Sequence, residues 1–425
     1  MSPRPVSVTM MAVGLVFALG YLLITTESLT GISKTTVALL MAVVGWTICM
    51  VSGPPLAGMA EAAEMPGTAR GLAEALADTC GTAFYVLGAM IVVAAVDDSG
   101  GFAVATRWLA TASTRWLLVR VTALTFVLSM FLDDMTTAII MVAVARNLVS
   151  DTKVRRWFVA MIVVAANAGG AVSPIGDVTT IMLWTHGRVV ARDLFLQLGG
   201  PAIVSVAVPL VFVCRRVGQC ETLRMRRRDA RTHSDGFDSQ SSVLPVRSFV
   251  FLLSAFLSIP VLQAVVGLPP FMSMFGLVAI VWQMKQGCIE RVMQRLNLST
   301  VLFFVGILLA VGTLKQSGLL DVLAPFLPAD HSTPVGIGLL SAVVDNVPLV
   351  TAAIQMFPVS AGRTFWLLMA YCASVGGSLL VIGSAAGIVA MGEERISFGW
   401  YLRHMTPVVL LGAMAGLGLF ACVFG

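Results

Sequence analysis

The chain has 425 residues, of which 58% are hydrophobic and only 12% are charged. Its mean hydropathy of +0.92 and its low charge, against about 25% charged residues in soluble domains, exclude a soluble globular enzyme and predict an all-α polytopic membrane protein. We interpret the formal net charge of +5 as loop charge that orients the chain in a bilayer, and not as a nucleic-acid-binding surface.

The first third of the chain contains apolar runs that are long enough to cross about 30 Å of hydrocarbon. They lie at about 6–24, 33–52 and 80–97, and we expect the acidic stretch 53–79 to be a loop between the last two. The region at about 119–149 is too long for one comfortable span, and its middle carries Asp133, Asp134 and Thr136. These features predict a re-entrant hairpin of two half-helices, because irregular backbone at membrane depth survives only inside protein or beside water.

The segment at about 156–185 is predicted to be a broken transmembrane helix. Residues that weaken helices gather in its middle, and Asp177 follows them directly; the others are Asn167, Gly169, Gly170, Ser173, Pro174 and Gly176. A broken helix exposes amides at one end and carbonyls at the other near the bilayer midplane. Carbonyl and carboxylate oxygens are suitable ligands for a hard cation.

A basic, polar linker at 217–246 follows, and the positive-inside tendency predicts that it is cytoplasmic. It separates two similar halves, 1–216 and 247–425. The string GGAVSPIGD at 169–177 resembles GGSLLVIGS at 376–384, and the triplet LDD at 132–134 resembles VDN at 344–346.

The second half therefore has a predicted hairpin at about 333–357 and a broken helix at about 363–391. Five crossings and one hairpin in each half would place the second half upside down relative to the first. The predicted fold is thus a pair of inverted-topology repeats, each with a re-entrant hairpin and a discontinuous helix.

Acidic side chains inside a membrane segment are costly, so by default they indicate ion or proton handling. The candidate ion- and proton-binding residues are Asp133, Asp134, Thr136, Asn167, Ser173, Asp177, Asp345, Asn346, Ser378 and Ser384. Backbone at the helix breaks is predicted at Gly169, Gly170, Gly176, Gly376, Gly377 and Gly383. The only metal we expect is the transported cation, held at Asp133, Asp177 and Asp345.

These acids suggest a mechanism. A carboxyl group in a partly desolvated cavity, with a second carboxyl group nearby, favours its protonated form. It can hold a proton near neutral pH and release it when a cation arrives. The cation and protons would then compete for the same oxygens, and exchange follows if the loaded or protonated site moves while the empty charged site does not.

Four strings resemble NhaD-type sodium/proton antiporters of the ion transporter superfamily: LDDMTTAIIMV, NAGGAVSPIGDVTTIMLW, VDNVPLV and SVGGSLLVIGSAAGIVAMG. The resemblance covers about residues 20–391. It implies that the transported cation, held at Asp133, Asp177 and Asp345, is sodium or lithium and is exported in exchange for protons. It also implies an elevator-type movement, a homodimer and no cofactor. The first hairpin motif of the family is usually Asp-Asn, whereas this chain has Asp133-Asp134, so its coupling stoichiometry is open.

Two alternatives remain at this stage. The same fold could carry another solute, a carboxylate or an oxyanion such as arsenite, although the hairpin aspartates repel anions. An intramembrane aspartyl protease is a more distant match through Gly176-Asp177. We expect a multi-pass protein of a bacterial inner (plasma) membrane.

Overall fold

The computed structural model describes residues 7–26, 30–52, 67–98, 109, 113–217, 254–255, 258–259, 262, 265–284, 289–294, 296, 298–380, 383–394 and 396–424. Over these residues the chain forms helices and turns without a strand, which confirms the predicted all-α class. The predicted linker 217–246 lies outside the described residues, apart from Val217.

The first half contains ten helical elements over the described residues. They are α1 (Val8–Thr25), α3 (Lys34–Ser52), α4 (Gly67–Asp98), α6 (Thr114–Ser129), α7 (Asp134–Leu148), α8 (Thr152–Gly170), α9 (Val178–Thr185), α10 (Ala191–Asp193), a π-helical turn (Leu194–Leu198) and α11 (Gly199–Val217).

The described residues of the second half contain α13 (Pro270–Met284), α14 (Ile289–Gln294), α15 (Leu298–Gln316), α16 (Leu319–Leu323), α17 (Ser332–Leu340), α18 (Asn346–Met356), α19 (Arg363–Gly376), α20 (Ala385–Glu394), α21 (Phe398–His404) and α22 (Thr406–Phe424). Short 3₁₀ turns occupy Ala324–Phe326 and Val359–Ala361. Both predicted hairpins and both predicted broken helices coincide with interruptions in helical structure, at 130–133, 171–177, 341–345 and, among the described residues, 377–380 and 383–384.

One predicted boundary is wrong. The expected loop 53–79 is helical from Gly67 onward, so α4 is 32 residues long. The segment 67–79 is rich in alanine and leucine, which have high helix propensity, and Arg70 pairs with Glu74 at 3.0 Å one turn later. We expected a loop because the segment is charged, but the exposed surface of a helix can carry the same charges.

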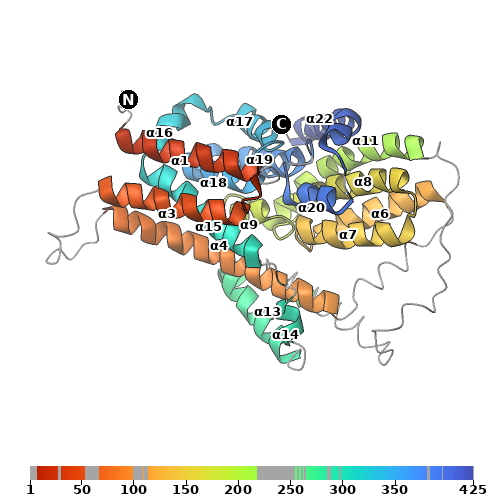
Figure 1. The fold of residues 1–425 in the computed structure, drawn as a ribbon, viewed down its shortest axis with the longest axis horizontal. Coiled ribbons are helices and arrows are strands. Elements are labelled where there is room, and N and C mark those ends of the chain that lie inside the picture. The colour runs from red at the N-terminus through yellow and green to blue at the C-terminus, as the bar shows by residue number, and fades with distance from the viewer. Residues whose placement is uncertain are drawn as a thin grey trace.

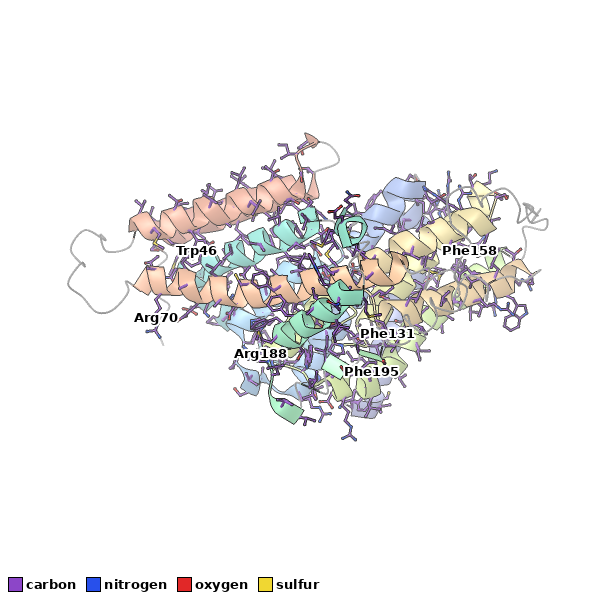
Figure 2. The ribbon with its side chains drawn as sticks, turned by 90° about the horizontal axis from the view of Figure 1, so that it is seen from below. Trp46, Arg70, Phe131, Phe158, Arg188 and Phe195 are labelled. Carbon is purple, nitrogen blue, oxygen red and sulfur yellow. The ribbon has the colours of Figure 1, made fainter. Side chains whose placement is uncertain are left out.

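Five segments of the described chain are long and apolar enough to cross a membrane: 34–52, 67–92, 191–217, 298–316 and 406–424. Figure 1 shows two groups of helices, with α9 between them. Helices α1, α3, α4, α13 and α15 pack together in the first group, and α6, α7, α8, α11, α17, α19, α20 and α22 in the second. Helix α18 contacts both α15 and α19. Trp46 lies in the first group, Phe158 in the second, and Phe131 between them (Figure 2).

The first group is assembled by contacts between the two halves of the chain. Gly88 of α4 faces Met274 of α13, and Gly306 of α15 faces the backbone of Ala38 in α3. Small residues at such positions let membrane helices approach closely, where van der Waals contact stabilises them. The indole of Trp46 also donates a 3.0 Å hydrogen bond to the Leu309 carbonyl.

In the second group, each hairpin packs against the broken helix of its own half. Ser129 donates to the carbonyl of Ala166 at 2.5 Å, and Ser341 donates to the carbonyl of Ala373 at 2.8 Å. Both serines stand four residues before a hairpin aspartate. The two halves therefore hold their interrupted helices together by the same type of contact, and this brings all four interruptions toward the centre of the molecule.

Candidate ion-binding site

The first hairpin turns at Asp133, which caps the N-terminus of α7. Its carboxylate accepts a 3.1 Å hydrogen bond from the amide of Thr136, as capping aspartates commonly do. Asp134 is the first residue of α7, and its carboxylate accepts from the Met135 amide at 2.8 Å. Both acids are thereby fixed at the positive end of a helix, where negative charge is favoured.

The second hairpin has the same layout, with Asp345 immediately before α18 and Asn346 as its first residue. The side chain of Asn346 contacts a residue of the first half of the chain. Its Nδ2 donates a 3.1 Å hydrogen bond to Asp177, which precedes α9 in the first half.

Asp177 is the most heavily hydrogen-bonded acid of the site. One carboxylate oxygen, Oδ2, accepts from Asn346, from the Thr179 hydroxyl at 2.7 Å and from the Ser374 hydroxyl at 2.6 Å. The other, Oδ1, accepts from the Thr179 amide at 3.2 Å. The residue is only 3% exposed, and neutral donors of this kind stabilise a buried carboxylate without neutralising it.

Asn167 of the first half likewise contacts the helix break of the second half. Its Nδ2 donates to the Ser384 hydroxyl at 3.1 Å and to the carbonyl of Val163 at 3.0 Å. Its Oδ1 has no hydrogen-bond partner, although the residue is 1% exposed. Ser384 also accepts from the Gly387 amide at 3.1 Å, at the start of α20.

A cavity of about 390 Å³ joins these residues to the first helix group. Among its lining residues are the acids Asp133, Asp134, Asp177 and Asp345, with Asn346 and Thr136 beside them and Lys34 as the one cation among the lining residues. Over the described residues, no three carboxylates lie close enough together to share one metal ion. A cation bound here therefore needs neutral oxygens as well as carboxylates.

Lys34 begins α3 and balances part of this negative charge. Its ammonium group lies 4.9 Å from the ring centroid of Phe303, a cation–π distance. It is also near enough to Asp345 for the two charges to interact.

Six of the ten predicted ion-binding residues line the cavity: Asp133, Asp134, Thr136, Asp177, Asp345 and Asn346. The other four lie around the helix breaks. Asn167 and Ser384 are joined as described, Ser173 accepts from the Ile175 amide at 3.1 Å, and the hydroxyl of Ser378 is buried without a partner.

The predicted glycines allow the backbone segments at each helix break to approach each other closely. A side chain on Gly170 would meet the Gly176 carbonyl at 2.8 Å, and one on Gly377 would meet the Gly383 carbonyl at 3.2 Å. Gly169 and Gly376 face the carbonyls of Phe126 and Gly338 on the adjacent hairpins. Their contribution is close packing of backbone.

Lys34, Ser374 and Thr179 belong to the site but were not among the residues predicted for it. A signal for Ser374 was present, because it stands ten residues before Ser384, as Asn167 stands ten residues before Asp177. Lys34 looked like an ordinary residue at the end of an apolar run.

Residues 3–365 match the family described as citrate transporter. The chain is 35% identical over 436 residues to "Sodium/proton antiporter 1" of Arabidopsis thaliana, covering 97% of this chain and 72% of the relative. It is 32% identical over 332 residues to "Na(+)/H(+) antiporter NhaD" of Alkalimonas amylolytica, covering 70% of this chain and 67% of the relative. It is 29% identical to the protein of the same name from Halomonas elongata, covering 89% and 80%.

A solved structure of MtrF from Neisseria gonorrhoeae, which represents a class of antimetabolite efflux pumps, shares the fold with a TM-score of 0.53. Identity is 12%, and the match covers 92% of this chain and 94% of that one. The apolar helices and these relatives together identify a multi-pass membrane transporter. The chain belongs to the citrate transporter family and, within it, to the NhaD-type sodium/proton antiporters.

Proposed function

We propose that this antiporter exports sodium or lithium, and that the cation and protons compete for the aspartates of the cavity. The observation that carries this proposal is Asp177, a buried carboxylate that neutral donors from α18 and α19 hold beside a cavity with three further aspartates. Hydroxyl and amide groups can turn from donating a hydrogen bond to offering an oxygen. The same side chains thus suit both an empty carboxylate and a bound sodium ion.

Competition follows from the cost of charge in this environment. A carboxylate with little access to water is stabilised either by a proton or by a cation, and four acids around one cavity repel one another. Binding of sodium lowers the affinity of these groups for protons, and a rise in proton concentration displaces sodium. The exchange of one for the other requires no cofactor.

We further propose an elevator-type movement of the second helix group, with its hairpins and broken helices, along α3, α4, α13 and α15. The division into two groups supports this assignment (Figure 1). The repeated contacts of the two halves support inverted repeats, and the first group would form a homodimer in a bacterial plasma membrane.

The chemistry of the cavity favours this function over transport of a carboxylate or an oxyanion. Four aspartates against one lysine among the lining residues repel an anionic solute. The protease alternative is set aside, because the relatives of the chain are transporters.

The decisive experiment uses purified protein in liposomes that contain a pH-sensitive dye. An inward sodium gradient should drive protons out of the vesicles, with lithium as an effective substitute and potassium as a poor one. Asp133→Asn and Asp345→Asn should each reduce the exchange at least tenfold, with yield and elution volume as controls for folding. Citrate-driven flux without sodium–proton exchange would refute the proposal.

A further inference from the structure

Among the described residues that line the cavity, Lys34 is the one basic side chain, and it comes from the first helix group. It is the first residue of α3, a helix without an acidic residue in its first turn. The positive end of a helix disfavours a lysine. Residues that break such a local rule are expected where they have a function.

Lys34 is fixed to the first helix group through both its backbone and its side chain. The hydroxyl of the next residue, Thr35, donates to the carbonyl of Ser299 at 3.0 Å and lies 2.8 Å from the Ser299 hydroxyl, at the start of α15. The ammonium group lies 4.9 Å from the ring centroid of Phe303, four residues further along α15. Helices α3 and α15, which lie side by side in Figure 1, therefore hold the charge as part of the first group.

Asp345 of the second hairpin faces the same cavity. It immediately precedes α18, which contacts α15. Asp133 caps α7 through a hydrogen bond from Thr136, whereas the carboxylate of Asp345 makes no capping hydrogen bond within the described helix α18. The ammonium group of Lys34 is near enough to attract this carboxylate. The two charges thus join the first helix group to the second hairpin.

We infer that Lys34 retains the empty carrier by attracting the carboxylate of Asp345, and that a sodium ion at this carboxylate ends the retention. The inference rests on the proposed function and deepens it. The ammonium group and sodium are both cations, so they compete for the same carboxylate oxygens. Sodium moves with the second helix group in the proposed movement, whereas Lys34 stays with the first group.

Retention of this kind couples movement to the presence of cargo. A carrier that crosses empty lets sodium run down its gradient without exchange. To cross empty, the carboxylate of Asp345 must leave the ammonium group, and separating opposite charges in a place with little water is costly. A bound sodium ion offsets the charge of the carboxylate and removes most of the attraction. Lys34 would therefore hold the empty carrier and let the loaded carrier pass.

Efflux of radioactive sodium from liposomes that contain the purified full-length protein, at one alkaline pH on both sides, tests this inference. Protons are scarce there, so sodium leaves either in exchange for external sodium or on carriers that return empty. Potassium with valinomycin holds the membrane potential at zero. We expect external sodium to speed efflux from wild-type liposomes about tenfold, because charge attraction slows the empty return.

The readout is the ratio of efflux with external sodium to efflux without it. Lys34→Gln should bring this ratio close to one, because nothing on α3 then retains the empty carrier, whereas Lys34→Arg should keep it well above one. Lys315→Gln is the matched control, since it removes an exposed lysine of α15 outside the cavity and should behave like the wild type. Phe303→Leu keeps the charge but removes the ring beside it, and should give an intermediate ratio.

Elution volume and thermal unfolding verify that each variant is folded. A purely structural role for Lys34 would lower the total flux of Lys34→Gln and leave its ratio at the wild-type value, which overturns the inference and leaves the proposed function intact. A wild-type ratio near one, or equal losses in Lys34→Gln and Lys315→Gln, also overturns it.

If Lys34→Gln is not recovered in folded form, Phe303→Leu decides the matter, and an unchanged ratio in that variant overturns the inference. A wild type that moves no sodium with or without external sodium refutes the proposed function itself.

Discussion

At the scale of single residues, the site depends on which group donates to Asp177. The hydroxyl of Ser374 gives its 2.6 Å hydrogen bond to a carboxylate, and a bond to a charged group contributes about 1.5–3 kcal/mol. The hydroxyl of Ser341, also fully buried, donates to a backbone carbonyl instead. Two buried serines of one helix group thus donate to acceptors of different charge, one to a carboxylate and the other to a neutral carbonyl.

Ser374→Ala should raise the sodium concentration that gives half-maximal exchange by about tenfold at neutral pH, because 1.4 kcal/mol corresponds to a factor of ten. The variant loses an oxygen that the proposed site offers to sodium, so sodium binding weakens whatever the proton concentration. The effect should therefore persist at strongly alkaline pH, where protons no longer compete. Sodium titrations of dye-loaded vesicles at several pH values measure it.

Ser341→Ala is the matched control. It should lower thermal stability without changing the sodium dependence at any pH, since no titratable group loses a partner. Equal shifts in sodium dependence for both variants would contradict the role assigned to Ser374.

At the scale of elements, the interrupted helices stay in place because glycines allow their backbones to touch. Gly338 of α17 packs against α19, where an added Cβ would lie 2.7 Å from the backbone carbonyl of Cys372. Two residues earlier in the same helix, an added Cβ on Gly336 would meet nothing within 4 Å. Helix α17 therefore packs closely against α19 at Gly338 and has open space beside Gly336.

Gly338→Ala should lower the unfolding temperature and strongly reduce exchange, because the hairpin must move away from α19 and overpacking costs about 1–3 kcal/mol. Gly336→Ala should leave both unchanged or slightly raise the unfolding temperature, since alanine favours the helix. Thermal unfolding of the two purified variants in detergent separates these outcomes. Equal destabilisation by both would show that close approach is not the reason for the glycine at 338.

At the scale of the whole molecule, the cavity lies where the two helix groups meet. Thr300 of α15 contributes to its wall from the first group. Leu302 of the same helix is 47% exposed and is absent from the wall. An ion in this cavity therefore lies near the face of α15 that carries Thr300.

Thr300→Trp should reduce the exchange rate at least tenfold by filling much of the 390 Å³ cavity, since an indole is among the largest side chains. Leu302→Trp places the same indole on the exposed side of α15 and should preserve the rate. Initial rates in liposomes, at matched protein content, test this pair. Full activity of Thr300→Trp would mean that ions reach the site by another route.

The interruptions of the helices could be predicted because glycine, proline and aspartate, concentrated within a few residues of an apolar run, weaken a continuous helix. The contacts between the halves could not be predicted, because no local pattern indicates that Asn346 contacts Asp177, which lies 169 positions earlier in the sequence. Lys34 was missed for a similar reason: hydropathy identifies it as the end of a span and says nothing about Phe303 or Asp345. The early start of α4 was missed because loop and helix surfaces can carry the same charges.

The ion pairs of Glu394 limit how α20 can move relative to α7 and α8. A single carboxylate, 4% exposed, holds guanidinium groups from α7 and α8 against the end of α20. Separating α20 from α7 and α8 would leave this buried carboxylate and Arg155, which is 16% exposed, without charged partners, at a cost of several kcal/mol. Arg146 is 39% exposed and would turn to water. In the proposed elevator movement, a displacement of α20 would therefore carry α7 and α8 with it, and the ion would travel inside a unit whose internal geometry stays constant.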